Sequence, residues 1–437
     1  MTREEANGRN FLFVSLDGLV GDIAWRVQEQ GNNVRYAITQ DMYSQDVADG
    51  FVPKVDDWEA HIGWSDVVVF DDGFGLGEHA ERLRGDGIPA VGGTRFTDRL
   101  EEDRGFGHET MAELGLNVID SVVFDSFDDG IRYVRENPNP YIIKPCGEAQ
   151  NYNELLYVGQ SDDGADVIQM LERYRDVWDG DVDAFQIQRR KEGVEISICG
   201  FFDGEEFVEP INYTFEHKRL FPGELGSMTG EMGTSMFWGG PNKLFRETVE
   251  RFETVLREEG YVGPFDINCI VNDEGIFPLE PTPRFGYPQI FIQEASMETP
   301  ISEFLYDLAT GTQPELEVHD GYQVGFRVCV PPFPADDMEW FEEHSRNLAV
   351  KFRDGKIPKG VHIEDLKHTD GEYRVAGETG EVLVVTGRGG SMREARQKAY
   401  DRVDDIVLPN KFYRTDIGEG WYTEAEQLIR WGYLRET

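Results

Sequence analysis

The sequence is poor in lysine and cysteine and contains no long apolar run. Its 437 residues include 11 lysines, 8 histidines and 4 cysteines. The cysteines are far apart and form no C-x-x-C motif, and the histidines show no paired spacing, so neither a disulfide framework nor a zinc site is indicated. A reducing cytoplasm is therefore the expected compartment. The cysteines are Cys146, Cys199, Cys269 and Cys329.

The same absences exclude further classes of protein. No apolar run approaches the ~18 residues that span a bilayer, and residues 1–5 lack the apolar core of a secretion signal, so no membrane partner is expected. Basic side chains number 42 against 84 acidic ones. A surface with a net charge of −42 repels phosphate backbones, so no nucleic-acid partner is expected either.

Acidic charge is spread along the whole chain. Dispersed carboxylates with few lysines are typical of proteins adapted to molar salt, where charge repulsion is screened within about 3 Å. We therefore expect a halophilic protein in a high-salt cytoplasm. The 12% aromatic content argues against a disordered acidic chain.

The pattern along the chain predicts an α/β region followed by two α+β regions. Residues 1–103 alternate apolar runs with helical spacing, which predicts a doubly wound parallel sheet. Its strands are expected at 11–15, 34–38, 66–70 and 88–91. Residues 104–317 and 318–437 interleave strands with helices. A helix is expected over 245–256, and Ser391 begins a capping box that starts another helix.

Two turns that follow expected strands contain several glycines. The segments 17–22 and 73–77 either cradle a phosphate group or form tight turns of an α/β domain. Negative charge lies where a phosphate would be bound, on Asp17, Asp22, Asp71 and Asp72. This negative charge favours the interpretation of both segments as tight turns of an α/β domain.

An acidic hairpin is expected over residues 265–280, with its turn at 272–275. It would bring Asp266 beside Glu280. Two carboxylates suit Mg²⁺, whereas an exposed edge hairpin with solvated acids is an equal alternative. A guanidinium fork also matches a carboxylate or phosphoryl oxygen. The residues that follow on the same run and lie at the edge of this site are Thr282 and Arg284.

Basic side chains at two places are candidates for phosphate contacts. Lys144 ends an expected strand at 141–144, and it is either a phosphate ligand or a surface lysine whose stem lies along apolar neighbours. Residues 217–219 are His-Lys-Arg and precede the glycine-bearing segment 226–233. We expect this segment to be a flexible loop, which either folds over a triphosphate or forms salt bridges at the surface.

Taken in order, these segments resemble the phosphoribosylamine–glycine ligase family of the ATP-grasp superfamily. The most distinctive matches are Glu216-His-Lys-Arg219, Thr229-Gly-Glu-Met-Gly233 and Glu280-Pro-Thr-Pro-Arg-Phe-Gly286. Further matches are Asp66–Gly93, Leu100–Gly115, Pro140–Pro145, Glu192–Ser197, Val385–Gly389 and Phe412–Gly418. Their shared order over about 350 residues argues against chance.

The resemblance implies three domains and a nucleotide site. A pre-ATP-grasp domain would occupy 1–103, a two-lobed ATP-grasp domain 104–317 with a mobile lobe at about 147–208, and a C-terminal α+β domain 318–437. ATP would be clamped between the two lobes. Its implied ligands are Arg104, Lys144, Gln188, Arg189, Arg190, Glu195 and Lys218. Mg²⁺, with Mn²⁺ as an alternative, would be held by Asp266, Glu280 and Thr282.

The reaction implied by the resemblance is the formation of a C–N bond in purine biosynthesis. A substrate carboxylate would attack the γ-phosphate of ATP, and an amine would displace phosphate from the resulting acyl phosphate. Arg284 would orient the carboxylate, and Lys218 would stabilise the charge that moves. The partners would be small molecules, an amino acid and an amine. The protein would be a monomer or a small homo-oligomer.

Departures from the family pattern leave three functions open. Segments 17–22 and 70–73 replace loops that would bind phosphoribosylamine, and residues 147–153 replace a glycine-rich loop. Thr282 stands where the family has an asparagine. The first function is phosphoribosylamine–glycine ligase activity. The second is the same chemistry on another amine, and the third is ATP binding without turnover.

The charge pattern generates a prediction about salt. Because repulsion among dispersed carboxylates destabilises the folded chain when it is not screened, lowering the KCl concentration should lower the unfolding temperature and finally unfold the protein. Circular dichroism melting curves over a KCl series check this. A melting temperature that does not respond to KCl would contradict it.

Overall fold

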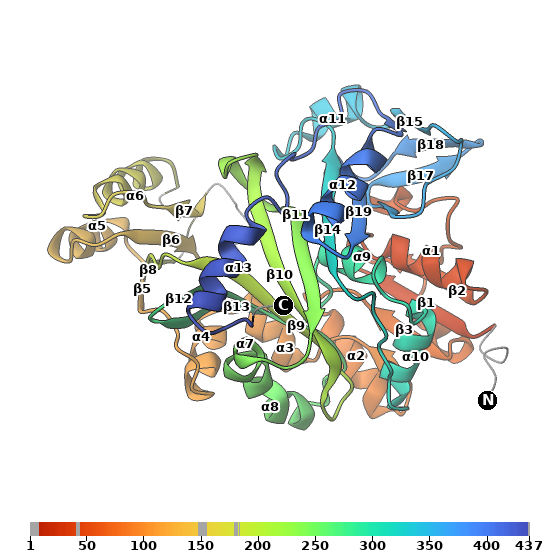
Figure 1. The fold of residues 1–437 in the computed structure, drawn as a ribbon, viewed down its shortest axis with the longest axis horizontal. Helices are drawn as coiled ribbons and strands as arrows, with labels where there is room; N and C mark the ends of the chain where they lie inside the picture. The colour runs from red at the N-terminus through yellow and green to blue at the C-terminus, as the bar shows by residue number, and fades with distance from the viewer. Residues whose placement is uncertain (1–7, 41–43, 147–154, 179–181, 183, 436–437) are drawn as a thin grey trace.

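The computed structural model describes residues 8–40, 44–146, 155–178, 182 and 184–435. The strands among these residues form four sheets (Figure 1). The first sheet has the order β2-β1-β3-β4 with parallel neighbours, which confirms the predicted α/β region. Its strands are β1 (Asn10–Ser15), β2 (Asn33–Ile38), β3 (Val67–Phe70) and β4 (Ala90–Val91). The helices nearest in sequence are α1 (Gly21–Glu29), α2 (Leu76–Gly85), α3 (Arg95–Glu102) and α4 (Arg104–Glu113).

The central strand β1 is apolar throughout because both of its faces are covered. Phe11 and Phe13 belong to the large core of the molecule, whereas Leu12 and Val14 pack in a second core with α2. A strand with two buried faces is a continuous apolar run rather than an alternating one. The carboxyl ends of β1 and β3 therefore sit at one edge of a rigid sheet, and the loops that follow them are positioned by that sheet.

A second sheet has the order β5-β8-β6-β7 and is antiparallel. Its strands are β5 (Ser121–Phe124), β6 (Tyr141–Pro145), β7 (Tyr157–Val158) and β8 (Phe185–Arg189), and its helices are α5 (Phe127–Glu136) and α6 (Ala165–Trp178). It has a separate core, and Figure 1 shows it projecting from the rest of the molecule. We expected a mobile lobe at about 147–208, whereas the strands of this lobe run from Ser121 to Arg189. Residues 147–153, which were expected to replace a glycine-rich loop, lie outside the described residues.

The third sheet has eight antiparallel strands in the order β13-β12-β9-β10-β11-β14-β19-β16. These are β9 (Val194–Phe202), β10 (Phe207–Phe221), β11 (Leu225–Gly239), β12 (Gly263–Asn272), β13 (Gly275–Thr282), β14 (Tyr322–Cys329), β16 (Val361–Ile363) and β19 (Glu381–Gly389). Strands from the C-terminal region thus continue the sheet of the middle region. A small fourth sheet, β17-β18-β15-β20, contains β15 (Ala349–Phe352), β17 (Leu366–Thr369), β18 (Glu372–Val375) and β20 (Ile406–Val407).

The remaining helices surround these sheets. They are α7 (Lys243–Glu247), α8 (Glu253–Glu258), α9 (Gln289–Glu294), α10 (Ile301–Thr310), α11 (Met338–His344), α12 (Met392–Val403) and α13 (Trp421–Arg430). Helix α12 begins as predicted, because the Ser391 hydroxyl accepts a hydrogen bond from the Glu394 N–H. No helix in the described ranges is both long and apolar enough to cross a membrane.

Two expectations about local structure are wrong. The segment 226–233 is not a loop, because it lies within β11 and pairs with β10 in a long hairpin. The expected helix over 245–256 is broken into α7, a 3-10 turn (Val249–Phe252) and α8. The break follows Thr248, whose hydroxyl donates to the Leu244 carbonyl and whose backbone is not helical. The apolar residues that predicted the helix are still buried, namely Phe245, Val249, Phe252 and Leu256.

A buried carboxylate joins the N-terminal sheet region to the C-terminal strands. Asp22 in α1 is fully buried and accepts hydrogen bonds from His362 Nδ1 at 2.7 Å and from the Ile363 N–H at 2.9 Å. It also forms an ion pair with Arg26 at 3.2 Å. Burial raises the pKa of Asp22, but Arg26 and His362 outweigh this effect and lower the pKa to about 2. The carboxylate is therefore charged at every pH at which the protein is expected to work.

This junction generates a prediction about stability. Replacing Asp22 by Asn removes a charge that two buried partners require, so D22N should lose about 3 kcal/mol of unfolding free energy at pH 7. Because the pKa is lowered in the folded state, the contribution is present above pH 4 and is lost as the pH falls toward 2. Urea unfolding midpoints measure the loss. The exposed Asp120→Asn control should change stability by less than about 0.5 kcal/mol, and an equal effect of both substitutions would contradict the prediction.

Candidate active site

Cations from different parts of the chain converge on the carboxylate of Glu280 in β13. Arg104, at the start of α4, lies 3.5 Å from it. Desolvation by the surrounding protein raises the pKa of Glu280, but Arg104, Lys218 and Lys144 outweigh it, and the pKa falls to about 2. The Glu280 side chain is still 48% exposed. A half-exposed carboxylate surrounded by positive charge is accessible to a ligand.

Lys144 is buried at the end of β6, with 7% of its surface exposed. Burial and the positive charge of Arg104 lower its pKa to about 8, against the opposing effect of Glu280. Lys144 and Glu280 therefore lie close enough to shift each other's pKa, although they come from different sheets. The predicted phosphate lysine and the predicted metal carboxylate belong to one site.

Lys218 in β10 is fixed by two glutamates. Its Nζ lies 3.0 Å from Glu195 and 3.3 Å from Glu216. Burial lowers the pKa of Lys218, but the two glutamates reverse the effect, so the pKa lies well above its usual value. The Asn268 amide donates to the same glutamates, at 3.1 Å and 2.9 Å. This network holds the ammonium group charged and in one position.

The strand register corrects the predicted metal site. Asp266 pairs with Thr282 across the hairpin, and the residue opposite Glu280 is Asn268. The expectation that Asp266 and Glu280 lie side by side is wrong, because the register set by the turn, together with a bulge after Asn268, shifts the pairing by two residues. The Asp266 carboxylate instead accepts hydrogen bonds from Ser197 and Gln289. Burial and the charge of Glu216 raise its pKa to about 7.

The residues around Glu280 nevertheless fit a magnesium ion bound to a nucleotide. The Oδ1 atom of Asn268 is buried and has no hydrogen-bond partner among the described residues. Mg²⁺ takes one or two protein oxygens and completes its shell with water and phosphate oxygens. Glu280 and Asn268 supply such oxygens. The described part of the chain contains no group of three or more His, Cys, Asp or Glu side chains that could hold a metal ion.

Arg284 links this site to the N-terminal sheet. Its guanidinium pairs with Glu101 of α3 at 2.8 Å and with Asp72, which follows β3, at 3.2 Å. Burial raises the pKa of Glu101 to about 7 even though Arg284 opposes the shift. The fork that was predicted to orient a substrate carboxylate is therefore occupied by protein carboxylates in this structure.

The loops after β1 and β3 present acidic groups rather than a phosphate cradle. Asp71 is buried and accepts hydrogen bonds from the Leu16 N–H at 3.2 Å and from the Tyr287 hydroxyl at 3.3 Å. Burial and the charge of Asp72 raise the pKa of Asp71 well above its usual value, and they raise that of Asp17 to about 6. Three carboxylates thus share one small region.

The strand β8 contributes a buried amide, that of Gln188, which is one of the implied ATP ligands. Gln188 shares a face of its sheet with Lys144, since Gln186, two residues earlier, pairs with Lys144. Its side chain is fully buried, and neither amide atom has a hydrogen-bond partner among the described residues. The N–H groups of Arg189 and Arg190 donate to the carbonyls of residues 120 and 140. The Arg189 side chain is exposed and that of Arg190 pairs with Glu192 at 2.7 Å, so neither joins the cluster at Glu280.

Sequence reasoning assigns no role to three polar residues at this site, Asn268, Glu216 and Glu231. Glu231 in β11 is 6% exposed, and its Oε1 atom has no partner among the described residues. Burial and the charge of Glu216 raise its pKa well above its usual value. The alternation of side chains along β10 places Glu216 and Lys218 on one face. It could therefore have indicated that Glu216 lies beside Lys218. The glycines of segment 226–233 predict a loop, and this prediction gives no indication that Glu231 is buried in a strand.

Comparisons with known proteins agree with this geometry. Residues 102–278 match the family description "Phosphoribosylglycinamide synthetase, ATP-grasp (A) domain", and residues 354–420 match its C domain. Phosphoribosylamine–glycine ligase of Lactococcus lactis is 24% identical over 76% of this chain and 78% of its own length. That of Corynebacterium ammoniagenes is 27% identical over 78% and 79%.

Solved structures share the fold. The crystal structure of phosphoribosylamine–glycine ligase from Thermotoga maritima superposes with a TM-score of 0.71 and 19% identity, covering 93% of this chain and 100% of that one. Biotin carboxylase from Campylobacter jejuni, solved with an ATP analogue, gives a TM-score of 0.63 with 13% identity and 97% coverage of both chains. Because residues 102–278 match an ATP-grasp domain description, the chain is an ATP-grasp protein. Its two matched regions make it similar to phosphoribosylglycinamide synthetases.

The lowered pKa of Lys144 generates a prediction about nucleotide affinity. Lys144 is charged below pH 8 and becomes neutral above it, so the dissociation constant for MgATP should rise above pH 8 by up to about tenfold per pH unit. Isothermal titration between pH 6.5 and 9.5 measures this. Lys144→Arg keeps the charge over the whole range, so the variant should show no such rise. The same pH dependence in both proteins would contradict the assignment.

Proposed function

We propose that this protein is an ATP-dependent carboxylate–amine ligase that acts through an acyl phosphate. The observation that supports this most strongly is the convergence of Arg104, Lys144 and Lys218 on Glu280. Three cations around one half-exposed carboxylate match the needs of a magnesium-bound triphosphate, because the cations bind phosphoryl oxygens and the carboxylate binds the metal. The curated relatives named above are ligases of this type.

The residues of the site have distinct roles in this proposal. Gln188 meets the adenine with its unpartnered amide, and Glu195 accepts the ribose hydroxyls. Lys144 and Lys218 bind phosphate oxygens, and Arg104 neutralises the charge beside them. Glu280, Asn268 and Thr282 would hold Mg²⁺ or Mn²⁺, which supplies charge neutralisation at the phosphates when bound. Asp266 is a poorer metal ligand, because its carboxylate already accepts two hydrogen bonds and its raised pKa favours the protonated form.

The chemical steps follow from this arrangement. A substrate carboxylate oxygen attacks the γ-phosphorus, the bond between that phosphorus and the β,γ-bridging oxygen breaks, and ADP leaves. The amine then adds to the acyl phosphate carbonyl, and phosphate departs with a proton lost from nitrogen. Lys218 is already fixed by Glu195 and Glu216, so it stabilises the moving charge without reorganising. Arg284 orients the carboxylate when it exchanges Glu101 or Asp72 for the substrate.

The acidic loops favour an amine other than phosphoribosylamine as the acceptor. Asp17, Asp71 and Asp72 lie at the edge of the N-terminal sheet where the resemblance placed the phosphoribosylamine loops. Carboxylates repel a phosphate monoester and attract an ammonium group. The second candidate function is therefore the same ligase chemistry with another amine. It differs from the first candidate only in the amine acceptor.

The setting proposed for this activity is a high-salt cytoplasm. The net charge of −42 supports halophily. A role in purine biosynthesis applies if phosphoribosylamine is the acceptor. We propose a monomer or a small homo-oligomer that acts on small molecules.

Measuring ADP release tests the function. In high KCl with MgATP, ADP should form only when a carboxylate and an amine are both present, first glycine with phosphoribosylamine and then other acids and amines. Lys144→Ala and Glu280→Ala should each lower turnover at least about 100-fold, because each removes a preorganised electrostatic contact. Lys243→Ala and Glu247→Ala, an exposed pair far from the cluster in sequence, serve as controls.

Each outcome separates the candidates. Turnover with phosphoribosylamine alone supports the family reaction, and turnover with another amine supports the second candidate. ATP binding without ADP release under all combinations would contradict ligase activity and support a nucleotide-binding protein. Full activity of either site variant would remove that residue from the mechanism.

A further inference from the structure

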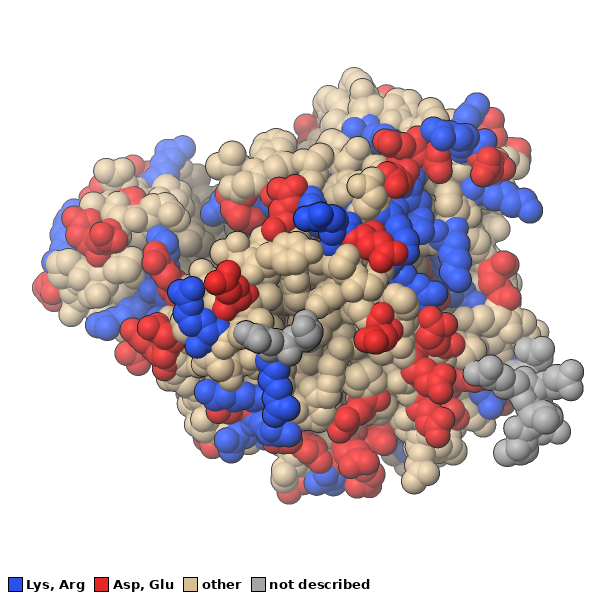
Figure 2. Space-filling model, in the orientation of Figure 1, with Lys and Arg blue, Asp and Glu red and all other residues tan. Residues whose placement is uncertain are grey.

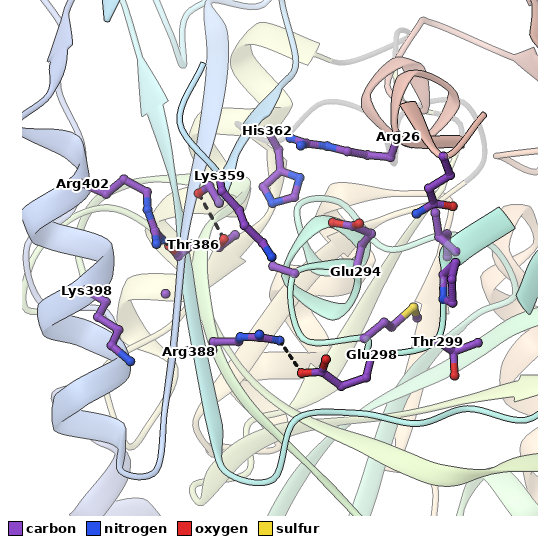
Figure 3. Close-up of a pocket in the computed structure, with 17 residues that line it drawn as sticks. Arg26, Glu294, Glu298, Thr299, Lys359, His362, Thr386, Arg388, Lys398 and Arg402 are labelled. Atoms are coloured by element: carbon purple, nitrogen blue, oxygen red, sulfur yellow. Dashed lines mark hydrogen bonds and ion pairs between the residues drawn. The ribbon is translucent and has the colours of Figure 1, made fainter. Parts of the chain in front are cut away.

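A second concentration of positive charge lies away from Glu280. A cavity of about 600 Å³ is formed by α1, the segment after α9, β16, β19 and α12 (Figure 3). Two acidic side chains line it, Glu294 and Glu298. The cations that line it are Arg26, Lys359, Arg388, Lys398 and Arg402. Figure 2 shows lysine and arginine atoms gathered between α12 and α1. In a chain with twice as many acidic as basic residues, this reversal of charge requires a reason.

The positive charge of the cavity is only partly neutralised. Arg26 pairs with Asp22 at 3.2 Å, and Arg388 pairs with Glu298 at 2.9 Å. Lys398 pairs with Glu394 at 2.7 Å on the surface of α12. Lys359 and Arg402 make no ion pair within the described residues. Arg402 donates to the Thr386 carbonyl, and burial alone lowers its pKa. The side chains lining the cavity carry a formal excess of three positive charges, and the partner carboxylates of Asp22 and Glu394 reduce the local excess to one.

A buried histidine adds an unpartnered polar atom to the cavity wall. His362 is 1% exposed, and its Nδ1 is held by Asp22 at 2.7 Å. Its Nε2 is buried and has no hydrogen-bond partner among the described residues. The ring stacks on Phe291 with centroids 5.6 Å apart, so it cannot turn without losing both contacts. Buried polar atoms are normally satisfied. Because the Nδ1 proton is donated to Asp22, Nε2 can donate to an anion in the cavity only when the ring is protonated.

The cavity is separate from the candidate active site. It takes Arg26 and Gln30 from the second half of α1, whereas the acidic loop of the active site precedes that helix. None of the cations around Glu280 lines it. An occupant of the cavity would therefore bind in addition to the nucleotide of the proposed ligase.

We propose that this cavity binds an anion that contains a diphosphate group. A guanidinium fork matches phosphoryl oxygens, and lysines add point charges around it. Arg402 and Lys359 make no ion pair within the described residues and leave positive charge for a diphosphate, whereas Arg26 and Arg388 would share their forks between the ligand and their protein carboxylates. Glu294 and Glu298 would select against larger, more highly charged anions by repulsion.

Titration with inorganic pyrophosphate tests this proposal. Isothermal titration at a fixed, high KCl concentration should show saturable binding to the wild-type protein. Lys359→Gln/Lys398→Gln removes two exposed lysines and should weaken binding at least about tenfold, since charged hydrogen bonds are lost. The control pair Lys351→Gln/Lys356→Gln makes the same change in net charge on exposed residues elsewhere and should leave the affinity unchanged.

Further arms locate the ligand and separate this proposal from the proposed ligase. Lys144→Ala should retain pyrophosphate binding, because the active site is not involved. ADP titrated into Lys144→Ala tells whether the cavity takes the diphosphate of a nucleotide or only a free one. The proposal is overturned if pyrophosphate does not bind, if Lys144→Ala abolishes binding while the double variant retains it, or if orthophosphate binds equally well. A dimer that dissociates only in the double variant would instead make this face an interface between two copies.

Discussion

Cations from three other parts of the chain surround the carboxylate of Glu280 and outweigh its desolvation, so that its pKa falls to about 2. Arg104 comes from the helix that follows the N-terminal sheet, Lys144 from the projecting lobe and Lys218 from the large sheet. Burial and the positive charges of Arg104 and Lys218 lower the pKa of Lys144, so negative charge among these cations stabilises their charged forms. Glu280 supplies part of that negative charge, and a bound triphosphate would supply the rest. The position of three structural units thus depends on one electrostatic arrangement.

The chain uses buried charge differently in its other regions. Asp22 has strong partners, and its pKa is lowered, which is typical of a structural junction. Asp71 and Asp17 have raised pKa values because burial and mutual repulsion dominate, which is typical of a site that awaits a cation. The basic cavity beside α12 is the opposite case, with an excess of cations and an unpartnered histidine nitrogen. The acidic loops and the basic cavity therefore each have a charge imbalance that a different ligand would correct.

The sequence was most informative where a pattern depends on local geometry. Apolar runs located β1 and β3, and the Ser391 capping box located the start of α12, because burial and capping act within a few residues. Lys144 and Glu280 were brought together only by the family resemblance, since no local rule joins two different sheets. The exact partner of Glu280 could not be predicted, because a bulge next to Asn268 changes the register. The β10–β11 hairpin was missed since its glycines suggested a loop, whereas long-range pairing with β14 stabilises β11 as a strand.

The most direct test of the account is a crystal structure of the protein with Mn²⁺ and a non-hydrolysable ATP analogue, in which anomalous scattering locates the metal. The account predicts a manganese peak bonded to Glu280 and to the Asn268 side-chain oxygen, with Lys144 and Lys218 in hydrogen-bond contact with the analogue's phosphates. A manganese peak at Asp266 without Glu280, or phosphates out of reach of both lysines, would contradict it.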